Sequence, residues 1–314
     1  MKTKERASKA KNRPGRALKP SAHTQVPYLL VVGTGEAFSQ SLGNTSYLFV
    51  PTARSLKSQK PCTVLIDCGY QVPERLWRKS LHLQVDTIAF THTHADHAGG
   101  LAPLIVRYWE EKRSAALHLI GPRGLAQYYI NHMDASYPGI RARLPFEVKI
   151  TEITLGKSHA LLETVLKSDH KLQVTGAPTR HSILNLALKF EVTFTRPPRS
   201  RHRNHIYSFC VSGDGAITPE VTKLYQGSNL VLQEVYTVSD KIPTHGSWTQ
   251  VSQLLRQRPR GHIGALGAVH FQRDAAEFIR RQINQDRRKY HPTKVFIPKA
   301  GQQIRLLATL NLFN

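Results

Sequence analysis

The chain carries its most informative segment at Thr91-His92-Thr93-His94-Ala95-Asp96-His97. Because His92 and His94 are two positions apart, an extended backbone points both imidazole rings to the same side. Asp96 and His97 follow where the chain is expected to turn. Nitrogen and oxygen donors packed this closely suit zinc or a similar divalent ion. Two neighbouring ions can share such a cluster, and paired metal ions commonly hydrolyse phosphate esters and amides.

The His-rich segment follows an apolar run, and similar runs recur along the chain. They predict strands at 28–32, 45–50, 63–67, 86–90, 117–120, 147–153, 160–165, 171–176, 185–195, 206–212, 229–234, 265–269 and 294–297. Helices are expected at 73–79, 100–112, from 121 onward, and at 218–224, 248–256 and 274–281. Such alternation predicts an α/β fold, in which sheets are covered by helices and active-site loops lie at strand ends.

Composition narrows the class of protein. The chain has 314 residues, of which 40 % are hydrophobic, as expected of a globular protein. No apolar run approaches the roughly 18 residues that span a bilayer, and the N-terminus lacks the apolar core of a secretory signal, so no membrane association is expected. The three cysteines, Cys62, Cys68 and Cys210, form no framework spacing. Their pattern indicates the reducing cytoplasm.

The charge is strongly basic, with a formal net value of +23. Residues 1–20 contain eight Lys or Arg and one Glu, which is +7 and leaves +16 for the rest. This excess favours polyanionic partners without identifying one. Residues 1–25 lack apolar periodicity and are interpreted as a disordered basic tail. Residues 26–314 show neither a repeat nor a linker and are interpreted as one domain.

Three further donors each follow a predicted strand. His181 lies in Thr179-Arg180-His181-Ser182, Asp214 in Ser212-Gly213-Asp214-Gly215, and His270 directly after the apolar run at 265–269. Taken alone, each would more often be an ordinary structural or surface residue. Because all of them lie at strand ends, as Asp96 and His97 do, they are expected to share one rim of the fold.

In this order of motifs, the chain from Tyr28 onward resembles the metallo-β-lactamase superfamily. Turn segments at Gly33-Thr34-Gly35, Asn44-Thr45-Ser46 and Ile66-Asp67-Cys68-Gly69 support the likeness. The resemblance implies a four-layer αββα sandwich with two divalent metal ions at one edge, Zn²⁺ being favoured and Mn²⁺ the alternative. It further implies that Asp214 bridges two ligand groups: His92, His94 and His181 in one, and Asp96, His97 and His270 in the other.

Further segments are similar to ribonuclease Z and its phosphodiesterase relatives. These are Gly121-Pro122-Arg123-Gly124-Leu125, Gln233-Glu234-Val235-Tyr236 and His245-Gly246-Ser247. In that branch a Glu orients a His near the leaving group, and the two motifs usually contain HEAT and HST. Here the first motif lacks its His and the second keeps only its His. The resemblance implies catalytic roles for Asp96, which steers the nucleophile or takes its proton, and for the Glu234–His245 pair.

One departure concerns the substrate. Bacterial ribonuclease Z inserts a long tRNA-gripping arm between the lone His and the bridging Asp, whereas here 33 positions separate them (214 minus 181). That interval contains a short basic segment whose arginines are candidates for substrate binding: Arg196, Arg199, Arg201 and Arg203. Either this segment or the tail could contact RNA in place of the arm, or the substrate is small, such as a cyclic nucleotide.

The sequence therefore predicts a zinc-dependent phosphodiesterase that works by dinuclear-metal hydroxide attack. The leading expectation is a ribonuclease Z-like endoribonuclease of the tRNA 3′-processing type, acting on RNA. The alternative is a cyclic-nucleotide or other small-molecule phosphodiesterase. A non-catalytic nucleic-acid-binding protein, a lactamase and a thioesterase are further hypotheses, since one fold supports many chemistries. The resemblance is also compatible with a homodimer.

Overall fold

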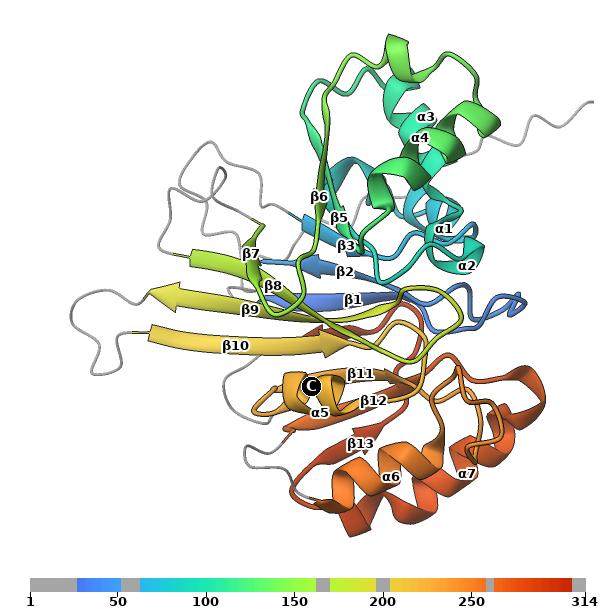
Figure 1. The fold of residues 1–314 in the computed structure, drawn as a ribbon, viewed down its shortest axis with the longest axis vertical. Coiled ribbons are helices and arrows are strands. Elements are labelled where there is room, and N and C mark those ends of the chain that lie inside the picture. The colour runs from blue at the N-terminus through green and yellow to red at the C-terminus, as the bar shows by residue number, and fades with distance from the viewer. Residues whose placement is uncertain (1–26, 52–62, 162–169, 196–203, 258–262, 307–314) are drawn as a thin grey trace, which may run out of the picture.

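The computed structural model describes residues 27–51, 63–161, 170–195, 204–257 and 263–306 (Figure 1). A first sheet of seven strands has the order β14-β1-β2-β3-β4-β5-β6. Its strands from β3 to β6 are parallel, and the others pair antiparallel. The bounds are β1 (Tyr28–Gly33), β2 (Ser46–Val50), β3 (Thr63–Ile66), β4 (Val85–Ala89), β5 (Leu117–Gly121), β6 (Val148–Glu152) and β14 (Gln303–Arg305).

A second sheet of seven strands has the order β13-β12-β11-β10-β9-β8-β7. Antiparallel pairing runs from β7 to β10, and parallel pairing from β10 to β13. The bounds are β7 (Ser158–Ala160), β8 (His170–Pro178), β9 (Leu186–Thr195), β10 (Asn204–Val211), β11 (Leu230–Glu234), β12 (Ala265–Val269) and β13 (Lys294–Phe296). Because β10, β11 and β12 are parallel, their C-terminal ends lie at one edge of the sheet, where α/β proteins place their sites.

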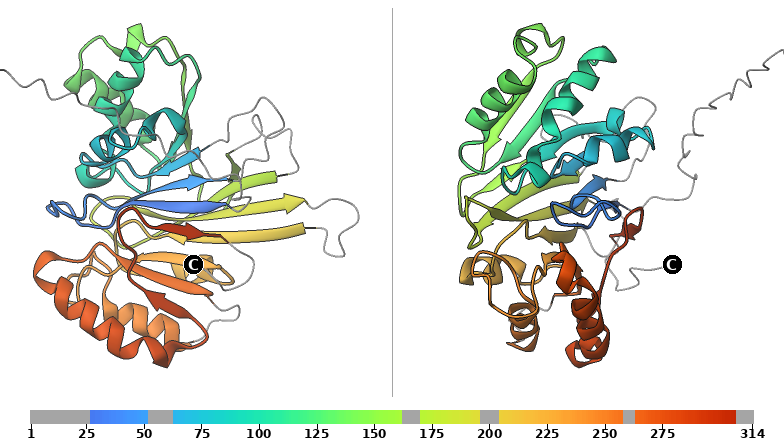
Figure 2. Two further views of the ribbon diagram at one scale, coloured as in Figure 1. Left: turned by 180° about the vertical axis from the view of Figure 1, so that it is seen from behind. Right: turned by 90° about the vertical axis from the view of Figure 1, so that its right-hand side faces the viewer.

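Helices cover the outer face of each sheet (Figures 1 and 2). On the first sheet these are α1 (Val72–Trp77), α2 (Ala95–Ala98), α3 (Leu101–Glu110) and α4 (Leu125–Ser136). On the second they are α5 (Pro219–Tyr225), α6 (Trp248–Gln257) and α7 (Ala276–Asp286). Short 3₁₀ turns are found at His82–Gln84, Arg141–Arg143, Arg273–Ala275 and Arg287–Tyr290. No helix in these described ranges is long and apolar enough to cross a membrane.

Three buried clusters show that the elements form four layers. The first joins side chains of both sheets, such as Phe49, Phe190 and Phe209, and lies between them. The second packs the first sheet against helices α1, α3 and α4, and the third packs the second sheet against α5, α6 and α7. Since apolar faces are buried on both sides of each sheet, the predicted αββα sandwich is confirmed.

The element bounds differ from the sequence prediction in a few places. Helix α4 begins at Leu125 rather than near 121, because Gly124 has a left-handed φ of +94° and Glu152 accepts hydrogen bonds from the N–H groups of Gly124 and Ala126. Strand β14 was not predicted, since only its central residue, Ile304, is buried. The tail at 1–25, the segment 162–165 and the four candidate arginines of 196–203 lie outside the described residues.

Candidate active site

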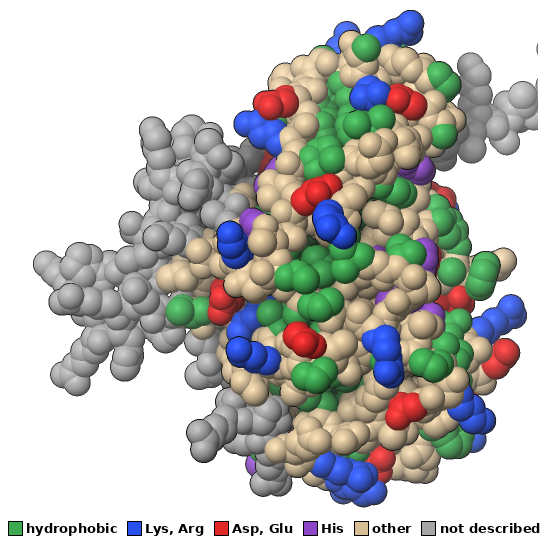
Figure 3. All heavy atoms as spheres, viewed as in Figure 1, with side chains coloured by type: hydrophobic (Ala, Val, Ile, Leu, Met, Phe, Trp, Pro, Cys, Tyr) green, Lys and Arg blue, Asp and Glu red, His purple; other side chains and the backbone are tan. Residues whose placement is uncertain are grey.

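Site residues follow the C-terminal ends of strands from both sheets. His92, His94, Asp96 and His97 come after β4, with the last two on the short helix α2. Asp214 follows β10, Glu234 ends β11, His270 follows β12, and His181 lies in the connection between β8 and β9. In Figure 3, several histidine side chains reach the surface on the right-hand side. The structure thus brings together all seven predicted metal-ligating residues.

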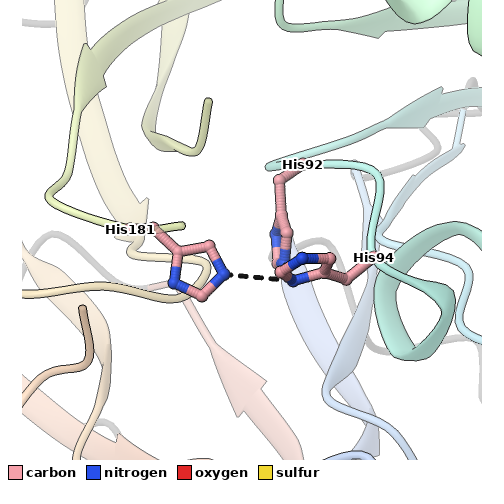
Figure 4. A group of neighbouring side chains, drawn as sticks. All are labelled: His92, His94 and His181. Carbon is pink, nitrogen blue, oxygen red and sulfur yellow. Dashed lines mark hydrogen bonds between the residues drawn. The ribbon is translucent and has the colours of Figure 1, made fainter. Parts of the chain in front are cut away.

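The first group consists of three histidines whose rings face one another (Figure 4). The Nδ1 atom of His94 lies 3.2 Å from Nε2 of His92 and 3.1 Å from Nε2 of His181. The backbone carbonyl of Thr244 accepts a hydrogen bond from Nδ1 of His181 at 2.8 Å. Because a neutral imidazole has one N–H, this bond leaves the Nε2 lone pair of His181 directed at the group.

The second group contains Asp96, His97, Asp214 and His270. Nε2 of His97 lies 3.1 Å from Asp214 and 3.5 Å from Asp96, and Nε2 of His270 lies 3.4 Å from Asp214. All four are nearly excluded from solvent, with exposed fractions of 9 % or less. A third overlapping group joins His181, Asp214 and His245. Asp214 therefore lies within reach of members of both ligand groups, as the predicted bridging role requires.

Outer contacts fix the orientation of the histidines. Asp67, which is 1 % exposed, accepts a 2.8 Å hydrogen bond from Nδ1 of His97, and its carboxylate also accepts bonds from the N–H and hydroxyl of Thr91. The hydroxyl of Thr45 lies 3.2 Å from Nδ1 of His270. Carboxylates and hydroxyls behind histidine ligands set the tautomer and ring direction. In the sequence, Asp67 stands out only as part of a turn segment, so its contact with His97 was not predicted.

Two buried polar atoms test whether this donor set fits metal ions. Nε2 of His97 and Oδ1 of Asp214 are fully buried and lie only 3.1 Å apart, yet neither atom forms a hydrogen bond with the other or with any further described residue. Buried polar groups in proteins are almost always satisfied, so such a pair calls for an explanation. A divalent ion coordinated by both atoms satisfies them together. Three histidines and a mixed His–Asp group are also the ligand types that zinc prefers.

Burial and mutual charge shift the pKa values of three of these residues. Burial, reinforced by His97, holds the pKa of His92 well below its ordinary value. Burial also acts to lower the pKa of His97, but Asp214 and Asp67 outweigh it, so that this pKa is raised well above the ordinary value. For Asp214, burial opposes ionisation, yet His270 and His97 hold its pKa well below the usual range.

Next to the two groups of predicted metal ligands, Glu234 and His245 form the pair expected from the sequence. Nδ1 of His245 lies 2.6 Å from Oε1 of Glu234, and Oε2 of Glu234 accepts hydrogen bonds from the N–H groups of Gly215 and Gly246. Glu234 is fully buried, whereas the His245 side chain is 20 % exposed. Burial acts to lower the pKa of His245. The hydrogen bond and the charge of Glu234 raise this pKa by more than burial lowers it, so the net shift is upward.

Tyr236 is a site residue that sequence analysis did not select. Its ring stacks on His245, with centroids 4.3 Å apart, and lies 6.1 Å from the ring of His270. The only signal in the sequence was its position in the motif containing Glu234, and an aromatic residue after a strand is usually part of a core. The contact with His245 is created by folding, because the two residues lie nine positions apart in the connection between β11 and α6 and meet only when that connection turns back on itself.

The two sheets covered by helices and this donor arrangement are those that the motifs predicted for the metallo-β-lactamase fold. The structure is similar to the metallo-β-lactamase fold protein YhfI from Bacillus subtilis, with a TM-score of 0.62 and 14 % identity. That similarity covers 89 % of this chain and 99 % of YhfI. At this level of identity the likeness concerns the fold alone.

A sequence model of the family described as anti-Pycsar protein Apyc1 matches residues 27–286. The chain therefore belongs to the anti-Pycsar protein Apyc1 family. The Apyc1 of Paenibacillus harenae is 36 % identical over 75 residues, which is 24 % of this chain and 28 % of that protein. Ribonuclease Z of Lachnospira eligens is 35 % identical over 98 residues, or 31 % of each chain. The matched regions thus span less than a third of these relatives.

Proposed function

We propose that this chain hydrolyses a phosphodiester bond of a small cyclic nucleotide. The observation that carries the proposal is the convergence of two ligand groups on Asp214 with a Glu-supported histidine, His245, beside them. Membership of a family whose proteins degrade cyclic nucleotides favours this substrate class. What stood as the alternative in the sequence analysis thereby becomes the leading hypothesis.

We assign the two ion positions to the ligand groups already described, with Asp214 shared between them. Two bound divalent ions would lower the pKa of a water molecule towards neutrality and neutralise the charge of the phosphate. Zinc is the proposed ion because the first group offers imidazole nitrogens alone, which suit it well. We also propose that Asp96, whose carboxylate lies near both His97 and His270, accepts the proton of the attacking water.

His245 supplies the second proton transfer. Glu234 occupies its Nδ1, so the proton available to the substrate is the one on Nε2. The raised pKa keeps His245 protonated to higher pH than an ordinary imidazole. As the new P–O bond forms from water, the bond from phosphorus to one ester oxygen of the ring breaks, and His245 donates its proton to that oxygen. General acid assistance of this kind accelerates a reaction by about 10²–10⁴-fold.

RNA remains a second candidate because of two observations. The first is the excess of Lys and Arg in the sequence, and the second is the similarity to a ribonuclease Z. On the described part of the face shown in Figure 3, however, Lys and Arg side chains are scattered among Asp and Glu rather than gathered in a stripe. RNA-binding surfaces usually concentrate basic residues along the path of the backbone.

The decisive experiment offers zinc-loaded protein a panel of cyclic nucleotides and a precursor tRNA side by side, after metal analysis. We expect turnover of a cyclic nucleotide that is lost in Asp214→Ala and His97→Ala and depends weakly on salt. Cleavage of RNA alone, with a steep loss of affinity as salt rises, would favour the second candidate. Deleting residues 1–25 should leave cyclic-nucleotide turnover intact. Activity unchanged in both variants would refute the metal assignment.

A further inference from the structure

Tyr236 is held between the two segments that carry His245 and His270. Its backbone N–H donates to the carbonyl of Gly246 at 2.9 Å, and its carbonyl accepts from the N–H of Gln272 at 3.0 Å. These bonds join Tyr236 to the residue after His245 and to the second residue after His270. The position of the Tyr236 ring is therefore set by the same backbone that sets the two imidazoles.

The ring of Tyr236 covers one face of His245. The centroids are 4.3 Å apart and the planes are inclined by 25°, which is a stacked arrangement. The ring of His245 also forms a T-shaped contact with that of His181, a predicted metal ligand, with centroids 5.0 Å apart and planes inclined by 81°. Tyr236 is only half-buried. The imidazole of His245 is thus in contact both with the Tyr236 ring and with a predicted metal ligand.

A single hydrogen bond does not fix an imidazole ring. The bond from Nδ1 to Glu234 anchors one atom of His245, but the ring can still turn about that anchor and move Nε2 away from the leaving oxygen. Stacking restricts this rotation, and a favourable aromatic pair contributes about 0.5–1.5 kcal/mol beyond its buried area. No hydrogen bond to the Tyr236 hydroxyl occurs within the described ranges, so the ring is the part of this side chain that acts on His245.

We propose that Tyr236 is a positioning residue whose ring orients His245 for proton donation to the leaving oxygen. This inference rests on the proposed function, in which His245 is the general acid. Burial and, to a smaller extent, the charge of Glu36 raise the pKa of the Tyr236 hydroxyl above its ordinary value, so the stacked ring stays neutral near neutral pH. The role belongs to the aromatic ring, and phenylalanine should therefore replace tyrosine while leucine should not.

The test compares Tyr236→Phe and Tyr236→Leu on two substrates with different leaving groups. Cyclic nucleotides release a sugar alkoxide, which needs a proton, whereas bis-p-nitrophenyl phosphate releases p-nitrophenolate, which departs without one. For Tyr236→Leu we expect kcat on cyclic nucleotides to fall by about 2–10-fold, which is the factor that the lost stacking energy corresponds to. Turnover of bis-p-nitrophenyl phosphate should stay close to that of the wild type, and Tyr236→Phe should behave as wild type on both.

A second readout is independent of activity and of metal. In the metal-free protein, the ring current of Tyr236 should shift the His245 ring protons upfield in NMR spectra, and Tyr236→Leu should abolish this shift. Tyr128→Leu serves as the matched control, because Tyr128 stacks on His132 at 5.1 Å on helix α4, away from the site. It should cost similar stability and leave both substrates unaffected.

Three results would overturn the proposal. These are equal losses on both substrates in Tyr236→Leu, a Tyr236→Phe variant as impaired as Tyr236→Leu, or His245 resonances that are the same in wild type and Tyr236→Leu. If the wild type hydrolyses neither substrate, the proposed function fails by itself. The NMR comparison then still decides whether the ring of Tyr236 orients His245.

Discussion

Replacing Asp67 by Asn tests how far the outer contacts of the centre determine metal binding. In the wild type, Oδ1 of Asp67 accepts from the N–H of Thr91, and Oδ2 accepts from both the Thr91 hydroxyl and Nδ1 of His97. An asparagine has only one oxygen. If that oxygen faces the Thr91 N–H, the amide NH₂ faces His97 and forces its proton onto Nε2, the atom that should bind the metal. If the amide oxygen faces His97 instead, the amide NH₂ faces the backbone N–H of Thr91, and the two donors oppose each other.

The magnitude follows from these alternatives. An unsatisfied buried donor costs about 1–3 kcal/mol, which should appear as lost stability of the metal-free protein. Loss of an outer-shell carboxylate typically weakens metal binding by about 10–100-fold, which corresponds to about 1.4–2.8 kcal/mol. The residue has a φ of +57°, a conformation that Asn tolerates as well as Asp, so backbone strain does not add to the effect.

Zinc affinity measured by competition with a chelator, together with urea unfolding of the metal-free protein, provides the assay. The matched control is Glu111→Gln, which removes a carboxylate 2.9 Å from Nε2 of the buried His82, on the outer helical layer. We expect both variants to lose stability but only Asp67→Asn to lose zinc affinity. A zinc affinity of Asp67→Asn within twofold of wild type, or an equal loss in Glu111→Gln, would refute the reasoning.

The remaining predictions concern charge, pH and metal removal. Asp214→Asn should lower the zinc content from two ions to one or none, measured by metal analysis, because its carboxylate serves both groups. Activity should fall as pH rises through the raised pKa of His245, since the acid form is the active one; Glu234→Gln should move this limb of the kcat/KM profile to lower pH. Removing the metal with a chelator should lower the free energy of unfolding by about 2.7 kcal/mol per ion, if each free ion was present at 100 times its dissociation constant. Thermal unfolding with and without the chelator measures this change.

The ligand set could be predicted from the sequence because its signals are local. The segment from His92 to His97 contains four donors: two in the extended stretch after β4 and two at the turn that follows it. The other donors each follow a strand. Strand β12 is apolar throughout, and the first three residues of β11 are apolar as well, as expected of strands that are covered on both faces. Such runs fix where strands end, and strand ends are where the fold collects its donors.

Contacts between distant segments could not be predicted in the same way. The carbonyl of Thr244 that orients His181 belongs to a connection 63 positions away, and the stacking of Tyr236 on His245 depends on how that connection returns to the sheet. Likewise, Glu152 ends one strand yet accepts the first N–H groups of helix α4. None of these partners is marked by spacing, because each pairing is decided by the packing of complete elements.

The charges of the centre also indicate how the ions are acquired. Asp214 is almost completely buried, and an isolated charge there would cost several kcal/mol. In the absence of metal, His97 lies beside this charge: burial acts to lower the pKa of His97, but Asp214 and Asp67 raise it by more, which favours the protonated ring. A metal ion that binds Nε2 of His97 must therefore displace this proton, and metal binding is coupled to proton release. The chain can thus fold around protonated His97 with its carboxylates already paired, and loading exchanges protons for ions within a site that is already formed.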